Sequence, residues 1–213
     1  MKKTLLIIFL IIVASFLIGI YFYPQMPNQL ASHWNTSGEV DGYMSKFWGL
    51  FLMPIISFLM YLLFIAIPYL DPLKENIEKF RKYYDGFIAL IILFLFFIYL
   101  LTIFWNLGWK FNMNFVLLPA IGILFYYCGI LIENAKRNWF IGIRNPWTLS
   151  SDEVWDKTHK IGAKLFKASG IIAILGAFSG KYSIFFILAP IIFSVIYTTI
   201  FSYIEFQKVR KNK

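Results

Sequence analysis

The chain has 213 residues, of which 60% are hydrophobic and only 15% are charged; its formal net charge is +9 and its mean hydropathy is +0.69. A soluble globular domain of this composition could not cover its surface with polar side chains, so the composition excludes an ordinary water-soluble protein. The length leaves no room for a separate soluble domain beside several membrane spans of about 20 residues each.

The first apolar run, residues 4–23, follows Lys2 and Lys3 and has the general form of a signal peptide. It is longer than a typical signal core, however, and bulky residues from Tyr21 to Pro24 follow it where a cleavage site would need small ones. We therefore expect a retained first membrane span.

Five more apolar stretches follow, most of them near the ~20 residues that a helical span requires. The sequence therefore predicts an all-α integral membrane bundle of about six transmembrane helices. The fifth is the shortest, and its basic start predicts an amphipathic interfacial helix before it. The expected spans are 4–23, 47–70, 84–105, 115–133, 165–179 and 183–204.

Basic residues divide unevenly between the two sides of the membrane that these spans define. Seventeen of the 20 Lys and Arg residues lie on the side of the two termini, and only Lys46, Lys110 and Lys181 lie on the other. Cytoplasmic segments are enriched in Lys and Arg, so both ends are expected in the cytoplasm of a multi-pass cell membrane protein. This distribution explains the basic charge without direct binding of nucleic acid.

Two connections are long enough to hold a binding site, and they define two membrane regions, 1–110 and 111–213. The external connection, 24–46, lies in the first region, and the cytoplasmic connection, 134–160, lies in the second. Candidate binding residues of the external loop are His33, Trp34, Asn35, Gly38, Asp41 and Lys46.

The cytoplasmic connection carries several local folding signals. Gly142 permits a backbone turn that other residues avoid, and Pro146 biases Asn145 toward an extended conformation. Ser150 followed by Glu153 has the pattern of a capping box, so a helix should begin there. We therefore expect an ordered loop that leads into the interfacial helix, whose Trp155 should lie on the membrane surface or on the bundle.

Arg144 lies close to Trp147 in this loop and allows two interpretations. It could clamp a phosphate or carboxylate, or it could be an arginine on lipid headgroups beside an aromatic anchor. In an ordered loop, its guanidinium should bond to backbone carbonyls, to an acidic side chain such as Glu133 or Asp152, or to a lipid phosphate.

The two histidines suggest metal binding only weakly. His33 with Asp41 could bind a cation outside and His159 with Asp156 could bind one inside, but turn chemistry and solvated helix charges explain these acids equally well. The expected topology separates the histidines across the membrane. The sequence also has no phosphate-binding loop, dinucleotide fingerprint or nucleophile elbow. No catalytic residue, cofactor or metal is therefore expected.

The stretch that runs through the cytoplasmic connection has a recognisable pattern, formed by Asn138, Gly142, Arg144, Pro146, Trp147, Thr148, Leu149, Trp155, Thr158, His159 and Gly162. In this order and spacing, these residues resemble the signature of the SdpI-type immunity protein family. The resemblance departs from the usual pattern at Asn145, where threonine is common. The external His33-Trp34-Asn35 with Gly38, Asp41 and Lys46 resembles the uncharacterised membrane domain that commonly precedes this signature.

The resemblance implies a bacterial membrane protein that protects its producer from a secreted peptide toxin. It also allows a second role, in which the protein relays toxin exposure to a cytoplasmic transcriptional repressor. The expected partners are therefore the lipid bilayer, an external peptide and a repressor. Two alternatives stay open: a small transporter or flippase whose cavity ends at Arg144 and His159, and a metal-assisted membrane hydrolase.

Overall fold

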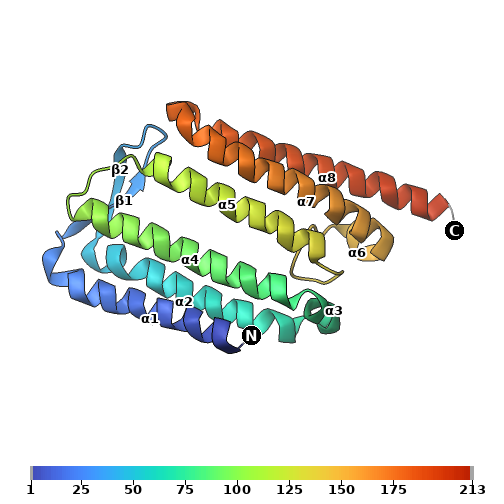
Figure 1. The fold of residues 1–213 in the computed structure, drawn as a ribbon, viewed down its shortest axis with the longest axis horizontal. Coiled ribbons are helices and arrows are strands. Elements are labelled where there is room, and N and C mark those ends of the chain that lie inside the picture. The colour runs from blue at the N-terminus through green and yellow to red at the C-terminus, as the bar shows by residue number, and fades with distance from the viewer. Residues whose placement is uncertain (1, 212–213) are drawn as a thin grey trace.

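The computed structural model describes residues 2–211, so Lys213 of the basic tail lies outside the described residues. The fold is a bundle of long helices with a small hairpin at one end (Figure 1). The expected all-α bundle of six membrane helices is confirmed. The six are α1 (Lys2–Phe22), α2 (Lys46–Leu70), α4 (Arg81–Asn106), α5 (Met113–Asn134), α7 (Asp152–Gly176) and α8 (Phe185–Lys211).

Short elements distinguish the two ends of the bundle. Both termini lie at one end, here called the basic end, together with two short helices (Figure 1). The opposite end, here called the hairpin end, carries two strands and two 3-10 helices. The basic-end helices are α3 (Lys74–Lys79) and α6 (Pro146–Ser150), and the hairpin-end elements are η1 (Tyr23–Gln25), β1 (Gln29–Trp34), β2 (Val40–Ser45) and η2 (Ala177–Tyr182).

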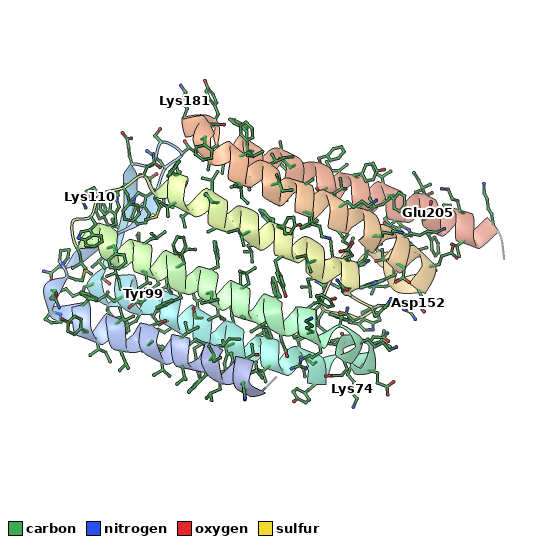
Figure 2. All side chains as sticks on the ribbon, viewed as in Figure 1. Lys74, Tyr99, Lys110, Asp152, Lys181 and Glu205 are labelled. Atoms are coloured by element: carbon green, nitrogen blue, oxygen red, sulfur yellow. The ribbon has the colours of Figure 1, made fainter. Side chains whose placement is uncertain are left out.

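The charged side chains follow this division. Lys74 and Asp152 lie at the basic end, whereas Lys110 and Lys181 lie at the hairpin end (Figure 2). Six spans bring the two termini to the same end, and the excess of Lys and Arg there assigns that end to the cytoplasm.

The six long helices pack as two groups of three. Helices α1, α2 and α4 form one group, α5, α7 and α8 form the other, and α4 contacts α5 between them. The largest buried cluster joins the groups at the basic end, with Ile67 and Tyr84 from the first and Leu131, Ile141 and Trp155 from the second. We keep the division into regions 1–110 and 111–213 as a proposal.

Helix α7 lies between α5 and α8, and small residues bring it close to α5 (Figure 1). A Cβ atom added to Gly122 would lie 2.6 Å from the Gly170 carbonyl oxygen, and one on Gly129 would lie 2.8 Å from that of Ala163. Ser169 is buried on the same helix. Small residues thus allow the backbones of two membrane helices to meet.

The start of α7 differs from the sequence-based expectation. The expected interfacial helix and the fifth span form one continuous helix of 25 residues. Its N-cap is Ser151, whose hydroxyl accepts from the Val154 N–H (3.4 Å), and not Ser150. Ser150 belongs to the last turn of α6 and donates to the Pro146 carbonyl (2.5 Å). The Ser150–Glu153 capping box was therefore a wrong prediction.

Candidate functional site

The external motif lies on an antiparallel hairpin, which hydropathy alone did not predict. His33 of β1 pairs with Gly42 of β2, next to an irregularity in the register. A Cβ atom at Gly42 would lie 2.9 Å from the His33 Cβ, so this glycine leaves room for the histidine. The pairing brings His33 Nδ1 to 2.5 Å from Asp41 Oδ1, and both side chains are well exposed (71% and 44%).

The root of the hairpin is fixed to the bundle by one amide side chain. Asn106, at the end of α4, accepts from the Ala31 N–H (2.8 Å) and donates back to the Ala31 carbonyl (3.0 Å). Neighbouring Leu30 is fully buried against Leu50 and Tyr99. The hairpin is therefore a docked element and not a free loop.

The hairpin tip is held by two further asparagines. Asn35 Oδ1 accepts from the backbone N–H groups of Ser37 (2.9 Å) and Glu39 (3.0 Å), which closes the tip. From the first turn of α5, Asn114 donates to the carbonyls of Asn35 (3.0 Å) and Thr36 (2.9 Å). These bonds set the distance between the tip and the second helix group.

Gly38 is required at this tip for two reasons. Its φ of +82° lies in the left-handed region that side chains disfavour. A Cβ atom there would also lie 2.8 Å from Asn112 Oδ1 at the N-cap of α5. Gly38 therefore shapes the tip and does not itself line the groove beside it.

An open groove runs between the hairpin, the start of α5 and the connection from η2 to α8. Its main part has a volume of about 450 Å³, and an adjoining part of about 320 Å³ shares Thr36, Asn114 and Ser183 with it. The main part is lined by His33, Trp34, Asn35, Thr36, Asp41, Asn114, Leu118, Ser183 and Ile184.

Trp34 contributes an unusual group to the wall of this groove. Its indole N–H is buried and has no acceptor among the described residues, while its ring packs edge-on against Trp105 (5.6 Å between centroids). Leaving a buried donor unpaired costs about 1–3 kcal/mol. The indole N–H therefore lies just behind the groove surface, where an acceptor on a ligand would reach it after a small shift of the wall.

Lys46 does not join the other external candidates. It begins α2, its N–H donates to the Asn28 carbonyl (3.0 Å), and its ammonium lies over the Tyr23 ring (5.3 Å). At the same end, the Lys110 ammonium lies 3.1 Å from the centre of the Trp105 ring, and partial burial lowers its pKa. Of the external candidates, His33, Trp34, Asn35 and Asp41 therefore line the main part of the groove. Lys46 and Lys110 do not line it.

At the basic end, the cytoplasmic loop is organised around Asn138, which is fully buried. Its Oδ1 accepts from the N–H groups of Phe140 (2.9 Å) and Ile141 (2.6 Å). Its Nδ2 donates to the carbonyls of Lys136 (2.8 Å) and Ile141 (2.8 Å). One side chain thus satisfies four backbone groups that the irregular loop would otherwise leave unpaired.

The next segment is fixed by a capping box different from the expected one. Asn145 has the extended backbone that Pro146 was expected to impose, and its side chain caps α6 by accepting from the Thr148 N–H (3.0 Å). Thr148 in turn accepts from the Asn145 N–H (3.0 Å). Asn145 also donates to Ser202 of α8 (2.8 Å), near the contact of Trp147 with Tyr203.

Trp155 and His159 close the loop from the side of α7. The Trp155 indole donates to the Ala135 carbonyl (2.8 Å). Its ring is fully buried on the bundle and stacks on the His159 ring, with 3.9 Å between the ring centroids. His159 Nε2 accepts from the Ile143 N–H (3.0 Å), so its Nδ1 carries the proton donated to the Trp155 carbonyl (2.8 Å). The same face of α7 buries Thr158 and Gly162.

Gly142 makes this arrangement possible. Its φ is +118°, as expected for a turn that other residues avoid, and a Cβ atom there would run into His159 Nε2. The contact brings the loop backbone onto the imidazole ring. His159 is therefore a neutral structural group of the interior.

Arg144 is less constrained than expected. It is exposed and makes one hydrogen bond, from Nη1 to the Trp139 carbonyl (2.6 Å), among residues 2–211. The expected carboxylate partners are engaged elsewhere: Asp152 pairs with Arg137 (2.7 Å) and Glu133 with Lys167 (2.5 Å). Of the expected partners, Arg144 therefore meets a backbone carbonyl and neither acid, and a bond to a lipid phosphate stays a prediction.

Asp71 is a residue of the loop that sequence reasoning missed. It ends α2, is almost fully buried, and accepts from the Leu73 N–H (2.7 Å) and the Trp139 N–H (2.8 Å). It therefore ties the first helix group to the cytoplasmic loop. Its position in the sequence, directly after an apolar span and before Pro72, could have indicated this role.

The two histidines lie at opposite ends of the bundle. Within residues 2–211, the His, Cys, Asp and Glu side chains form no group of three that could hold a metal ion. Asp156 pairs with Lys136 (3.7 Å), and both ring nitrogens of His159 bond to the backbone instead.

Comparison with known proteins connects these two ends to described families. Residues 134–202, which contain the cytoplasmic loop, match the SdpI/YfhL protein family. Residues 10–58, which contain the hairpin, match a domain of unknown function, DUF1648. The chain is also 27% identical over 214 residues to the protein named Immunity protein SdpI of Bacillus subtilis (strain 168), and the match covers the whole of both chains. No solved structure matches.

These similarities agree with the family resemblance in the sequence. Together with the six apolar helices, they show a multi-pass protein of the cell membrane.

Proposed function

We propose that this chain is a non-enzymatic immunity protein that protects the cell against a secreted antimicrobial peptide. The main support is its similarity, over the full length of both chains, to a protein named as an immunity protein. The groove at the hairpin end supplies a place where such a peptide would bind.

The groove offers groups that suit a peptide. The unpaired indole N–H of Trp34 would donate to a backbone carbonyl once a small shift of the wall uncovers it, and the exposed His33–Asp41 pair would meet polar side chains. Leu118 and Ile184 provide apolar surface in the same wall. A volume of about 450 Å³ lies within the range of about 300–1,000 Å³ that is typical of ligand pockets.

The two alternative functions receive less support. A transporter ending at Arg144 and His159 needs both side chains on one vestibule, but His159 is only 2% exposed and its two ring nitrogens are hydrogen-bonded within the loop. A metal-assisted hydrolase needs several ligands together, and the two histidines lie at opposite ends of the bundle.

Survival of a sensitive strain tests the proposal directly. Cells that express the chain would be exposed to a panel of secreted bacterial killing peptides, and we expect survival to rise against at least one of them. Trp34→Phe keeps an aromatic ring, although a smaller one, and removes the N–H, so it should reduce protection. The matched control is Tyr69→Phe, an exposed aromatic residue at the basic end. Unchanged killing by every peptide would contradict the proposal.

A second candidate function is a relay to a cytoplasmic repressor, and one connection favours it. Helix α2 begins directly after β2 of the hairpin and ends at Asp71, which holds the Trp139 N–H of the cytoplasmic loop (2.8 Å). One helix therefore links the groove to the loop. We propose that peptide binding shifts the loop through this connection.

Amide hydrogen exchange would measure such a shift. A peptide active in the survival assay should change exchange in residues 138–145 of the intact protein, and Asp71→Ala should abolish that change without abolishing peptide binding. Identical loop exchange with and without bound peptide would rule out the relay.

A further inference from the structure

A second cavity lies at the basic end, where the two helix groups meet. It has a volume of about 270 Å³ and is lined by α2, α4, α5, α7 and the cytoplasmic loop. Phe87, Leu131 and Phe166 line it from three helices, and Phe140 and Ile143 line it from the loop. The only side-chain hydroxyl in its lining, that of Tyr84, already donates to the Phe64 carbonyl (2.8 Å).

This lining suits a hydrocarbon better than water. Water in a protein cavity needs two to four polar partners, and these walls offer almost none. An empty space would lose dispersion contacts along all its walls. The cavity is also open on one side and lies among helices that span the membrane. An acyl chain from the surrounding bilayer would fill it without desolvating any polar group.

The loop that forms one wall of the cavity also carries an available cation. Arg144 follows Ile143 directly, is exposed, and donates to the Trp139 carbonyl with one of its five N–H groups. Within the described residues, no carboxylate lies within 4.0 Å of it. Trp139 and Phe140 are exposed beside it, as is common for aromatic side chains at the headgroup level.

We propose that the cavity and Arg144 form one binding site for an anionic phospholipid of the cytoplasmic leaflet. An acyl chain occupies the apolar cavity, and the phosphate accepts hydrogen bonds from the free N–H groups of Arg144. Charge complementarity supports an anionic lipid, because 16 of the 19 Lys and Arg residues within residues 2–211 lie at this end. The inference does not depend on the immunity function.

Lipid competition on the purified full chain tests the headgroup. Phosphatidylglycerol and phosphatidylcholine with identical chains would compete, and the lipids retained would be counted by native mass spectrometry. We expect phosphatidylglycerol to be preferred about fivefold, as for one basic side chain near an anionic headgroup. Arg144→Gln should abolish the preference while some lipid is still retained. Lys160→Gln, which removes another exposed basic residue of the same end, should leave it unchanged.

A photoreactive acyl chain tests the cavity without any substitution. Phosphatidylglycerol with a diazirine in its chain should crosslink mainly to residues 84–87, 128–132 and 140–143 of the native protein. Crosslinks spread evenly over the lipid-facing sides of all six helices would overturn the proposal, as would equal retention of both lipids. Thermal protection by inorganic phosphate alone, equal to that by the lipid, would also overturn it, because it would show a phosphate site without an acyl chain.

Discussion

The hairpin and the cytoplasmic loop use similar residues for different purposes. In the loop, Asn138 and Trp155 are fully buried, and their polar atoms bond to the loop backbone and to the end of α5. In the hairpin, His33 and Asp41 bond to each other at the surface, and the Trp34 N–H stays unpaired beside an open groove. The loop side chains therefore hold the fold together, whereas the hairpin presents groups that a ligand can meet.

The largest effect should come from Trp155. Trp155→Ala removes a fully buried ring and its bond to the Ala135 carbonyl, so the free energy of unfolding should fall by about 3–5 kcal/mol. Thermal unfolding in detergent measures this loss. Trp139→Ala is the matched control, because Trp139 is 52% exposed. Equal losses for the two variants would show that the buried Trp155 contributes no more to stability than the exposed Trp139 does.

Asn138→Ala should have the next largest effect. It leaves two N–H groups and two carbonyls of the loop without their partner, and each buried unsatisfied group costs about 1–3 kcal/mol before water relieves it. Asn134→Ala, which removes a single bond to the Ile130 carbonyl (2.8 Å), should cost clearly less. Equal unfolding temperatures for the two alanine variants would show that the four bonds of Asn138 stabilise the protein no more than the single bond of Asn134.

Gly142→Ala should be destabilising by about 1–3 kcal/mol, because it forces a side chain into the left-handed region and against His159. Gly108→Ala is the control, since Gly108 has a similar φ of +106° but open space around its Cβ position. A cost for Gly142→Ala no larger than that for Gly108→Ala would show that the contact with His159 is unimportant.

The sequence predicted the spans well because hydropathy is a sum over many residues. The predicted range 47–70, for example, differs by one residue from α2. It did not predict the hairpin, since β1 buries the adjacent residues Leu30 and Ala31 and depends on the distant Asn106. A strand held by a helix 75 residues away shows no simple alternation.

The local sequence signals of the cytoplasmic loop predicted part of its structure. Gly142 and Asn145 adopt the expected backbone, because their restrictions are intrinsic to glycine and to the residue before proline. The helix start moved from Ser150 to Ser151, because Ser150 belongs to the last turn of α6 and either serine can cap a helix. Asp152 and Glu133 are not partners of Arg144, because they pair with Arg137 and Lys167. Tertiary packing determines these pairs, so local sequence does not predict them.

Arg144→Ala and Lys160→Ala should show the smallest difference in stability. Both side chains are exposed, so in detergent their thermal unfolding should be nearly the same. In bilayers that contain phosphatidylglycerol, Arg144→Ala should damage stability and protection more than Lys160→Ala. Indistinguishable variants in both media would mean that Arg144 has no organised role.

Protection and stability measured together on two variants test the division between the ends most directly. Trp34→Phe should lower survival in the presence of the peptide while the unfolding temperature stays near that of the unchanged protein, because removal of the unpaired N–H offsets the loss of packing by the smaller ring. Asn138→Ala should lower the unfolding temperature, with protection falling only as the amount of folded protein falls. If Trp34→Phe instead lost stability and protection in parallel, or if Asn138→Ala lost protection at full stability, the assignment of binding to the hairpin end and of structural support to the cytoplasmic loop would be contradicted.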